Sequence, residues 1–155
     1  MSQTSIAIPI IATPEPCQST PEAQDHDLLD PLCRLAGDLH AARALIVAEH
    51  GLELMCGLLR RGCPTATVLR LGDKPDADGY SLVFVPRTAA LPSSDAVIRL
   101  ARRALAPKGR LIAGVSDTRA AAALARRLRL NRFSALHSIH LPGLVLLRAD
   151  LRRPS

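Results

Sequence analysis

From Ala44 onward, short and mainly apolar runs alternate with segments of helical hydrophobic period, and this pattern limits the chain to few folds. Apolar runs of this length are typical of parallel strands that helices cover on both faces. The predicted strands are ALIVA (44–48), ATVLRL (66–71), YSLVFV (80–85), RLIAGV (110–115), FSALHSIHL (133–141) and LVLLRAD (144–150). The alternation predicts an α/β fold with a doubly wound, Rossmann-like sheet of about six strands, mostly parallel.

The last two predicted strands are joined by only Leu141-Pro142-Gly143. A parallel connection needs a dozen or more residues, so this link predicts an antiparallel C-terminal hairpin.

Four segments have the period and end signals of helices. The first begins at Asp30-Pro31, with Asp30 as N-cap, and continues towards His40. The second covers 52–62, where Leu52, Met55, Leu58 and Leu59 share one face and Gly62 ends the helix. The third covers 91–105, is capped by Ser93, Ser94 or Asp95, and turns Val97, Ile98, Ala101 and Leu105 inward. The fourth covers 116–130 and is also capped.

The N-terminal segment differs in composition from the rest of the chain. Residues 1–24 are rich in Pro, Ser, Thr and Gln without a periodic apolar pattern, which predicts a disordered tail before a single α/β domain over 25–155. No basic residue precedes Arg34, and no apolar run is long enough to span a bilayer. We therefore expect a cytoplasmic protein with no membrane segment.

We expect no metal site in this chain. The four cysteines, which are Cys17, Cys33, Cys56 and Cys63, show no CxxC spacing and are most simply free thiols. His137 and His140 are three residues apart in a predicted strand, so their side chains point to opposite faces and cannot share a metal ion.

The order of motifs resembles the class I S-adenosylmethionine-dependent methyltransferases over roughly residues 43–150. DAVIRLARRALAPKGRLIAGV (95–115) is similar to the family's helix, glycine-containing turn and fifth strand. DGYSLVFVP (78–86) resembles the fourth strand, and SALHSIHLPGLVLLRA (134–149) resembles the reversed last strand. The resemblance implies S-adenosylmethionine as cofactor, with Glu49, His50 and Gly51 at the end of the first strand as binding residues.

The first loop departs from the family pattern, which is acidic-x-Gly-x-Gly-x-Gly. Glu49 and Gly51 match the acid and the first glycine, but Glu53 and Met55 occupy the other glycine positions. Glycines there let the backbone approach the cofactor, and side chains crowd it. Glu53 also places negative charge near the expected position of the methionine carboxylate, at a helix N-terminus that attracts anions.

The chain is also shorter than the family pattern by a strand and its helix. RLGDKPDADGYSLVFV (70–85) resembles the third strand running into the fourth, which makes Asp73 the acid near the adenine, but connectivity puts this segment in the second strand's place beside the first strand. In that place Arg70 or Leu71 replaces the ribose-binding acid. Asp73 also lies in Gly72-Asp73-Lys74-Pro75, which is ordinary turn chemistry, and we favour the turn.

The missing strand predicts a bare sheet edge at strand 66–71, which a homodimer contact or a protein partner would cover. Arginines recur with helical spacing in two clusters, which are Arg99, Arg102 and Arg103, and then Arg126, Arg127, Arg129 and Arg132. Such stripes can bind phosphate, although a solvated helix face is the simpler interpretation.

Three functions remain open at this point. The first is a methyltransferase-like domain with an eroded cofactor site, a pseudoenzyme that acts as an interaction or regulatory module. The second is an active S-adenosylmethionine-dependent methyltransferase on an unknown acceptor, in which the enzyme positions donor and acceptor in line. The third is a nucleic-acid-binding module that uses the arginine-rich helix faces. No residue is identified as catalytic.

Deletion of residues 1–24 should leave the domain folded, because this tail lacks the periodicity of a core-forming segment. Urea denaturation of the full-length and shortened chains measures the difference. A loss of unfolding free energy above about 1–2 kcal/mol would contradict the prediction.

Overall fold

A computed structural model describes residues 28–70, 73–75, 79–88 and 94–152. The helices in this part of the chain are α2 (Leu29–Ala36), α3 (Leu52–Arg60), α4 (Ser94–Ala104) and α5 (Thr118–Leu130). The strands are β1 (Arg43–Val47), β2 (Thr65–Leu69), β3 (Tyr80–Val85), β4 (Leu105–Val115), β5 (Phe133–Leu141) and β6 (Leu144–Leu151). The predicted tail 1–24 lies outside the described residues.

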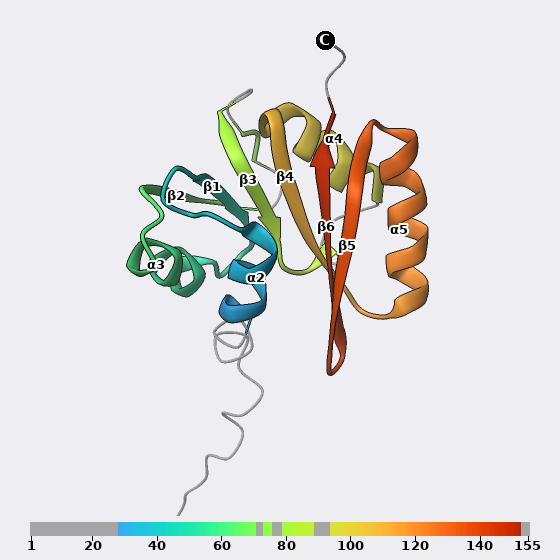
Figure 1. The fold of residues 1–155 in the computed structure, drawn as a ribbon, viewed down its shortest axis with the longest axis horizontal. Coiled ribbons are helices and arrows are strands. Elements are labelled where there is room, and N and C mark those ends of the chain that lie inside the picture. Colours follow the sequence, from blue (N-terminus) through green and yellow to red (C-terminus); the bar gives the residue numbers. More distant parts are fainter. Residues whose placement is uncertain (1–27, 71–72, 76–78, 89–93, 153–155) are drawn as a thin grey trace, which may run out of the picture.

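The six strands form one sheet in the order β2-β1-β3-β4-β6-β5 (Figure 1). The first four pair in parallel, and β6 lies antiparallel between β4 and β5. The α/β fold, the mostly parallel sheet and the antiparallel C-terminal hairpin are therefore confirmed. None of the helices in the described part of the chain combines the length and the apolar character that a membrane crossing needs.

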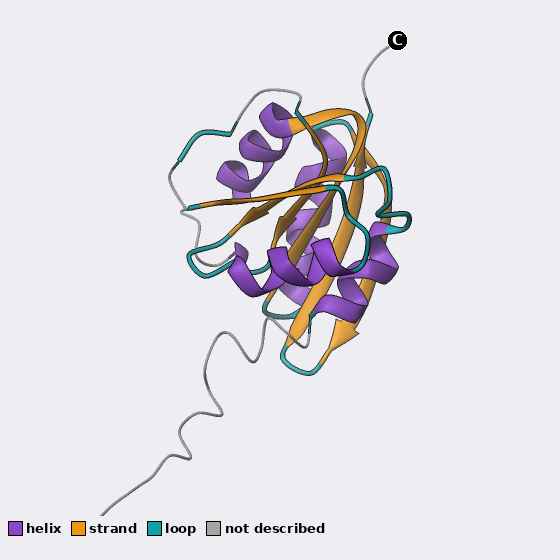
Figure 2. Ribbon diagram, turned by 90° about the vertical axis from the view of Figure 1, so that its left-hand side faces the viewer, coloured by secondary structure: helices purple, strands orange, loops and turns teal. Residues whose placement is uncertain are grey.

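Alternate residues of the central strands build two separate cores, one on each face of the sheet. On one face, Leu45, Val83 and Leu111 pack with α4 and α5. On the other face, Ile46 and Phe84 pack with α2 and α3, and both are fully buried. Figure 2 shows helices on both sides of the sheet. This two-sided burial explains why these strands are continuous apolar runs.

The connection from β2 to β3 crosses the sheet without a helix in its described residues. β2 is at the edge beside β1, and β3 is on the other side of β1, so the chain must pass over β1. Pro75 is buried in this connection, and its carbonyl oxygen accepts a hydrogen bond from Arg103 Nε of α4 at 3.2 Å. The connection therefore crosses on the α4 side. The expectation that strand 66–71 lies beside the first strand is correct.

The start of the first helix differs from the sequence prediction. The N-cap of α2 is Leu28, which makes no side-chain capping bond, and Asp30 lies inside the first turn. The Asp30 carboxylate pairs instead with Arg61, just beyond the end of α3. The helix ends at Ala36, because Gly37 takes a positive φ of 79°, so His40 does not belong to it. A long-range ion pair thus replaces the predicted local cap.

The predicted face of α3 is only partly buried, because Leu58 is in the core but Leu52 and Leu59 are exposed. The helix buries Leu54, Gly57 and Leu58, whereas Leu52 is 63% exposed and Leu59 is 42% exposed. Gly57 is at the contact with α2, where an added Cβ would lie 2.6 Å from Leu29 Cδ2. Two of the four leucines of α3 therefore point away from the core, because the close contact with α2 requires the face that contains glycine.

The remaining helices agree closely with the sequence. Asp117 caps α5 by accepting a hydrogen bond from the Ala120 backbone nitrogen at 2.7 Å. α4 begins at Ser94 and buries Val97, Ile98 and Ala101 as predicted, while Leu105 is buried as the first residue of β4. The alternative cap Ser93 lies outside the described residues.

Two arginines of the sheet bind the last carbonyls of α2. Arg148 Nη1 of β6 donates to Leu35 O at 3.1 Å, and Arg110 Nη1 of β4 donates to Ala36 O. Asp150 holds both arginines, with its carboxylate oxygens 3.2 Å from Arg148 Nε and 3.8 Å from Arg110 Nε. Positive charge at a helix C-terminus is favourable, and these bonds satisfy carbonyls that the helix itself leaves free. The cluster therefore fixes this short helix to the sheet.

Arg148→Met should lower the free energy of unfolding by about 1–3 kcal/mol, because it leaves the Leu35 carbonyl unbonded and removes one cation from Asp150. Arg99→Met, at an exposed position of α4, is the matched control and should change it by less than about 0.5 kcal/mol. Urea denaturation measures both. Equal effects of the two substitutions would show that the cluster does not hold α2.

Candidate functional site

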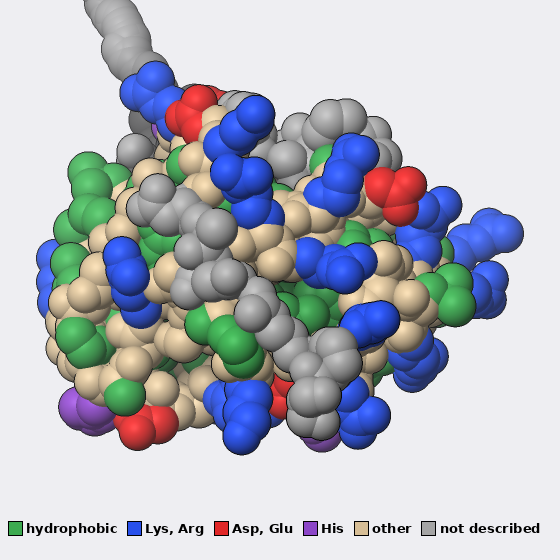
Figure 3. All heavy atoms as spheres, turned by 90° about the horizontal axis from the view of Figure 1, so that it is seen from above, with side chains coloured by type: hydrophobic (Ala, Val, Ile, Leu, Met, Phe, Trp, Pro, Cys, Tyr) green, Lys and Arg blue, Asp and Glu red, His purple; other side chains and the backbone are tan. Residues whose placement is uncertain are grey.

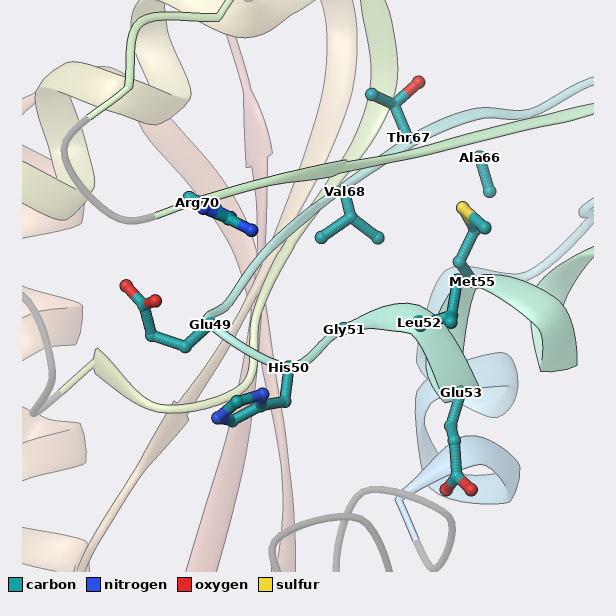
Figure 4. A pocket seen from close by; sticks show the side chains of 10 residues that line it. All are labelled: Glu49, His50, Gly51, Leu52, Glu53, Met55, Ala66, Thr67, Val68 and Arg70. Carbon is teal, nitrogen blue, oxygen red and sulfur yellow. The ribbon is translucent and has the colours of Figure 1, made fainter.

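An open groove of about 830 Å³ lies where β1 ends and α3 begins. Its lining comes from the loop after β1, from the first turns of α3 and from β2, and consists of Glu49, His50, Gly51, Leu52, Glu53, Met55, Ala66, Thr67, Val68 and Arg70. Figure 4 shows Glu49, His50 and Arg70 at one end of the groove and Met55 and Ala66 at the other. Open α/β sheets bind ligands at the carboxyl ends of parallel strands, and the first end of the groove lies there.

Three of the four predicted site residues lie together in this groove. Glu49, His50 and Gly51 follow β1 directly, and the side chains of Glu49 and His50 are exposed. No ion pair joins Glu49 to any other residue in the described ranges, so its carboxylate is free to accept hydrogen bonds from a ligand.

Asp73 lies apart from the groove lining and belongs to a turn. It is exposed, and its backbone nitrogen donates to Arg70 O at 3.2 Å. A hydrogen bond from the backbone nitrogen of residue i+3 to the carbonyl oxygen of residue i is typical of a β-turn, which agrees with the turn interpretation. Arg70, which follows the end of β2, is the charged side chain that this strand contributes to the groove.

Gly51 is buried between the sheet and α3. A Cβ on this residue would lie 3.0 Å from Ile46 Cγ2 and 3.1 Å from Val68 Cγ1, which is closer than ordinary carbon contacts. Its φ of −100° is available to any residue. The packing of α3 against β1 and β2 therefore requires a small residue at this position even without a ligand.

The helix begins immediately after this glycine. Met55 N donates to Gly51 O at 3.0 Å, which closes the first turn of α3, and no side chain caps this end. Glu53 and Met55 are therefore helical residues rather than loop residues. In Figure 4 the Glu53 side chain points away from β2, while Met55 extends towards Ala66.

The loop after β3 turns away from β1. Thr88 Oγ1 donates to Gly114 O of β4 at 2.9 Å, and Pro86 O would lie only 2.1 Å from a Cβ added to Gly114. A second cavity of about 580 Å³ lies here, lined by Leu28, Pro86, Arg87, Leu141, Pro142, Gly143 and Leu144. This cavity is not predictable from sequence patterns, because its lining comes from three segments that are distant in the chain.

The described residues hold no group of three His, Cys, Asp or Glu side chains that could bind a metal ion. Cys33, Cys56 and Cys63 are free thiols, and Cys17 lies outside the described residues. Burial raises the pKa of the Cys33 thiol, although nearby Arg61 partly offsets this effect. At neutral pH the Cys33 side chain is therefore a protonated thiol, which is a poor nucleophile.

No protein-family model matches the chain, and no curated protein matches its sequence. Solved structures match its fold. A ribosomal protein L11 methylase from Lactobacillus delbrueckii superposes with a TM-score of 0.65 at 13% identity, over 84% of this chain and 79% of that one. A SAM-dependent methyltransferase from Thermotoga maritima gives 0.54 at 12% identity, over 83% of this chain and 89% of that one.

A third structure comes from a larger protein. The Thermus thermophilus 16S rRNA N2 G1207 methyltransferase gives a TM-score of 0.56 at 17% identity, over 85% of this chain but only 41% of that one. These likenesses agree with the strand order, the reversed β6 and the two helical layers described above. The chain therefore has the fold of the class I S-adenosylmethionine-dependent methyltransferases, in a shortened form.

Proposed function

We propose that this chain is a cytoplasmic methyltransferase-like domain whose S-adenosylmethionine site is eroded, and that it works as a non-catalytic interaction or regulatory module. The observation that carries the proposal is the start of α3 at Leu52, directly after Gly51. Only residues 48–51 separate β1 from α3, so the positions of the family's second and third glycines, Glu53 and Met55, lie inside the helix, where their backbone is less accessible to a cofactor.

Two side chains oppose the cofactor in this arrangement. Glu53, in the first turn of α3, places a carboxylate where the methionine carboxylate would seek the positive end of the helix. Met55 lines the same groove and is partly buried against the core, so it cannot leave without a loss of packing. Both effects weaken cofactor binding.

The end of β2 supports the same conclusion. Val47 is paired with Leu69, so Arg70 follows the last paired residue of β2, where a ribose-binding acid would be expected. A guanidinium has no acceptor for the ribose hydroxyls. Asp73 is exposed, belongs to a turn and does not line the groove.

The alternative is an active methyltransferase on an unknown acceptor. Gly51 and the free carboxylate of Glu49 favour it, because they match the first half of the cofactor motif and line a groove of suitable size. In that case the cofactor would supply the methyl group, and the chain would hold donor and acceptor in line.

Titration calorimetry with S-adenosylmethionine distinguishes the eroded site from the active methyltransferase. The wild type should bind with a Kd near 1 mM or weaker, because each crowded contact costs about 1–3 kcal/mol. Glu53→Gly with Met55→Gly should bind at least tenfold more tightly, despite a helix cost of about 1 kcal/mol for each glycine. Micromolar binding by the wild type would contradict the eroded site and support the active enzyme.

The matched control is Leu59→Gly with Arg60→Gly, which puts two glycines at exposed positions in the last turns of α3. This pair loosens the helix equally but leaves the groove unchanged, so the affinity should stay at the wild-type value. An equal gain in both double variants would show that helix loosening, and not relief of crowding, improves binding.

The distribution of arginine favours one further candidate, a module that binds nucleic acid through phosphate. The last turns of α3, α4 and α5 carry Arg60, Arg102, Arg103, Arg127 and Arg129. In a doubly wound sheet such helix ends lie towards the amino ends of the parallel strands, with α3 on the opposite face of the sheet from α4 and α5. Figure 3 views that end of the molecule, where Lys and Arg side chains far outnumber acidic ones. A basic surface of this kind binds phosphate backbones without reading sequence.

Arg102→Gln with Arg129→Gln should weaken binding of a random RNA and reduce the slope of log K against log salt by about one to two. Arg99→Gln with Arg119→Gln changes the same two helices at exposed positions farther from this end and should have a smaller effect. Fluorescence anisotropy at several salt concentrations measures both. Salt-independent binding, or none at low salt, would exclude this candidate.

A further inference from the structure

The outer edge of β2 has backbone groups that no described strand pairs with. β2 is the last strand of the sheet, and its Leu69 carbonyl accepts from Ala48 N at 3.1 Å. Because backbone groups alternate along a strand, the N–H and C=O groups of Ala66 and Val68 point outward from this edge. Edge strands are usually protected by charge, and Thr65–Leu69 carries none.

An apolar stripe of α3 runs beside this edge. Leu52, Met55 and Leu59 are three and four residues apart and so share one helix face. Leu52 and Leu59 are two of only three large hydrophobic side chains that are exposed in the described residues. Leu52 and Met55 line the groove together with Ala66 and Val68, so the helix stripe and the strand edge form one continuous surface.

We propose that this surface binds a second copy of the same chain. The two β2 strands pair antiparallel about a twofold axis at Thr67, and the two α3 helices pack along the stripe of Leu52, Met55 and Leu59. Both layers of the fold then continue across the interface, and the sheet extends through both protomers.

The direction of the backbone groups selects this register. With the axis at Thr67, Ala66 lies opposite Val68 of the partner subunit, and both residues direct N–H and C=O groups towards the new ladder. Two such pairs form by symmetry, and the two Thr67 side chains meet on the axis as a favourable Thr–Thr pair. If the register between the two β2 strands shifted by one residue, the outward-pointing N–H and C=O groups of one strand would lie opposite backbone groups of the other strand that already bond to β1.

Neighbouring registers are less favourable. An axis at Ala66 places Val68 opposite Pro64 of the partner subunit, which has no N–H to donate. An axis at Val68 places Arg70 opposite Ala66 of the partner subunit. The Arg70 carbonyl oxygen would have to accept a hydrogen bond there, but it already accepts one from the Asp73 backbone nitrogen. With the axis at Thr67, Arg70 lies opposite the partner's Pro64 and not opposite a second arginine, so no like charges meet.

The helical layer is compatible with the same axis. New strand pairs are about 4.8 Å apart, and packed helices about 8–10 Å apart, so helices that lie slightly inside the edge strands come into contact. By helical spacing, Glu53 and Arg60 lie on the other side of α3, away from the stripe. The helical part of the interface is therefore uncharged, and in the strand part the charge of Arg70 does not face a second arginine.

Self-association by this route does not depend on the proposed function, since strand pairing requires neither the presence nor the loss of a cofactor site. It would cover the open side of the groove near Ala66 and Thr67. An experiment on oligomeric state therefore tests it separately from the cofactor titration.

Thr67→Cys tests the axis directly. Directly opposed residues in this type of pair have Cα atoms about 4.5 Å apart, within the range of a disulfide. Diamide oxidation should convert most of this variant into a covalent dimer at low protein concentration. Leu130→Cys, on the 79% exposed Leu130 of α5, and the wild type, with its native cysteines, are the controls and should cross-link far less. Equal cross-linking of all three would overturn the proposed axis.

Thr67→Lys tests the interaction without a covalent bond. Two lysines would meet on the axis, so dimer affinity measured by analytical ultracentrifugation should fall at least tenfold, while Leu130→Lys keeps the wild-type affinity. Thermal unfolding checks that each variant is folded, and Leu52→Glu replaces Thr67→Lys if that variant is not. A wild type that stays monomeric up to about 1 mM, or a dimer insensitive to these changes, would overturn the proposal.

Discussion

The requirement to cover both faces of β1, β3 and β4 determines where the other elements lie. Leu45, Val83 and Leu111 point to one face, and Ile46 and Phe84 point to the other, so neither face can be left in water. Burial of one large apolar side chain contributes about 1.5–3 kcal/mol, and the two cores together contain more than thirty buried hydrophobic residues. α4 and α5 cover one face along most of its length. On the other face α2 is a helix of only 8 residues, and the bonds from Arg110 and Arg148 to its last carbonyls hold it in place.

The same requirement explains what the shortening of the fold changes. The described residues of the connection between β2 and β3 contain no helix, but they still cover part of the α4 face, where Pro75 is buried and its carbonyl oxygen accepts a hydrogen bond from Arg103. No described strand lies beyond β2, however, so this strand stays half-exposed along most of its length, unlike the buried central strands. The shortening of the fold therefore leaves one edge of the sheet, the strand β2, incompletely covered.

Patterns that depend on neighbours in sequence were predictable, and contacts between distant segments were not. YSLVFV is β3 residue for residue, Asp117 caps its helix, and the link at Pro142 makes the antiparallel hairpin. The cap at Asp30 was wrong because a partner 31 residues away, Arg61, takes its carboxylate. The predicted face of α3 was correct for Leu58 but not for Leu52 and Leu59, because the contact between Gly57 and Leu29 of α2, which the sequence pattern does not reveal, sets which face of the helix is buried. In the site, Glu49, His50 and Gly51 were found by their place after a strand, and Arg70 by its place at the end of the next strand. Thr67 joins the groove only through strand pairing.

Gly51 carried most of the sequence argument for a cofactor, and the structure gives it a second explanation. Contact with Ile46 and Val68 demands a small residue whether or not a ligand binds above it. A glycine kept by packing can persist after binding is lost, whereas glycines at positions 53 and 55, inside a helix, would have only the ligand to justify a cost of about 1 kcal/mol each. The groove and the β2 edge also share Ala66, Thr67 and Val68. A ligand in the groove and a second copy on the edge would therefore compete for the same surface, and by linkage each would weaken the binding of the other.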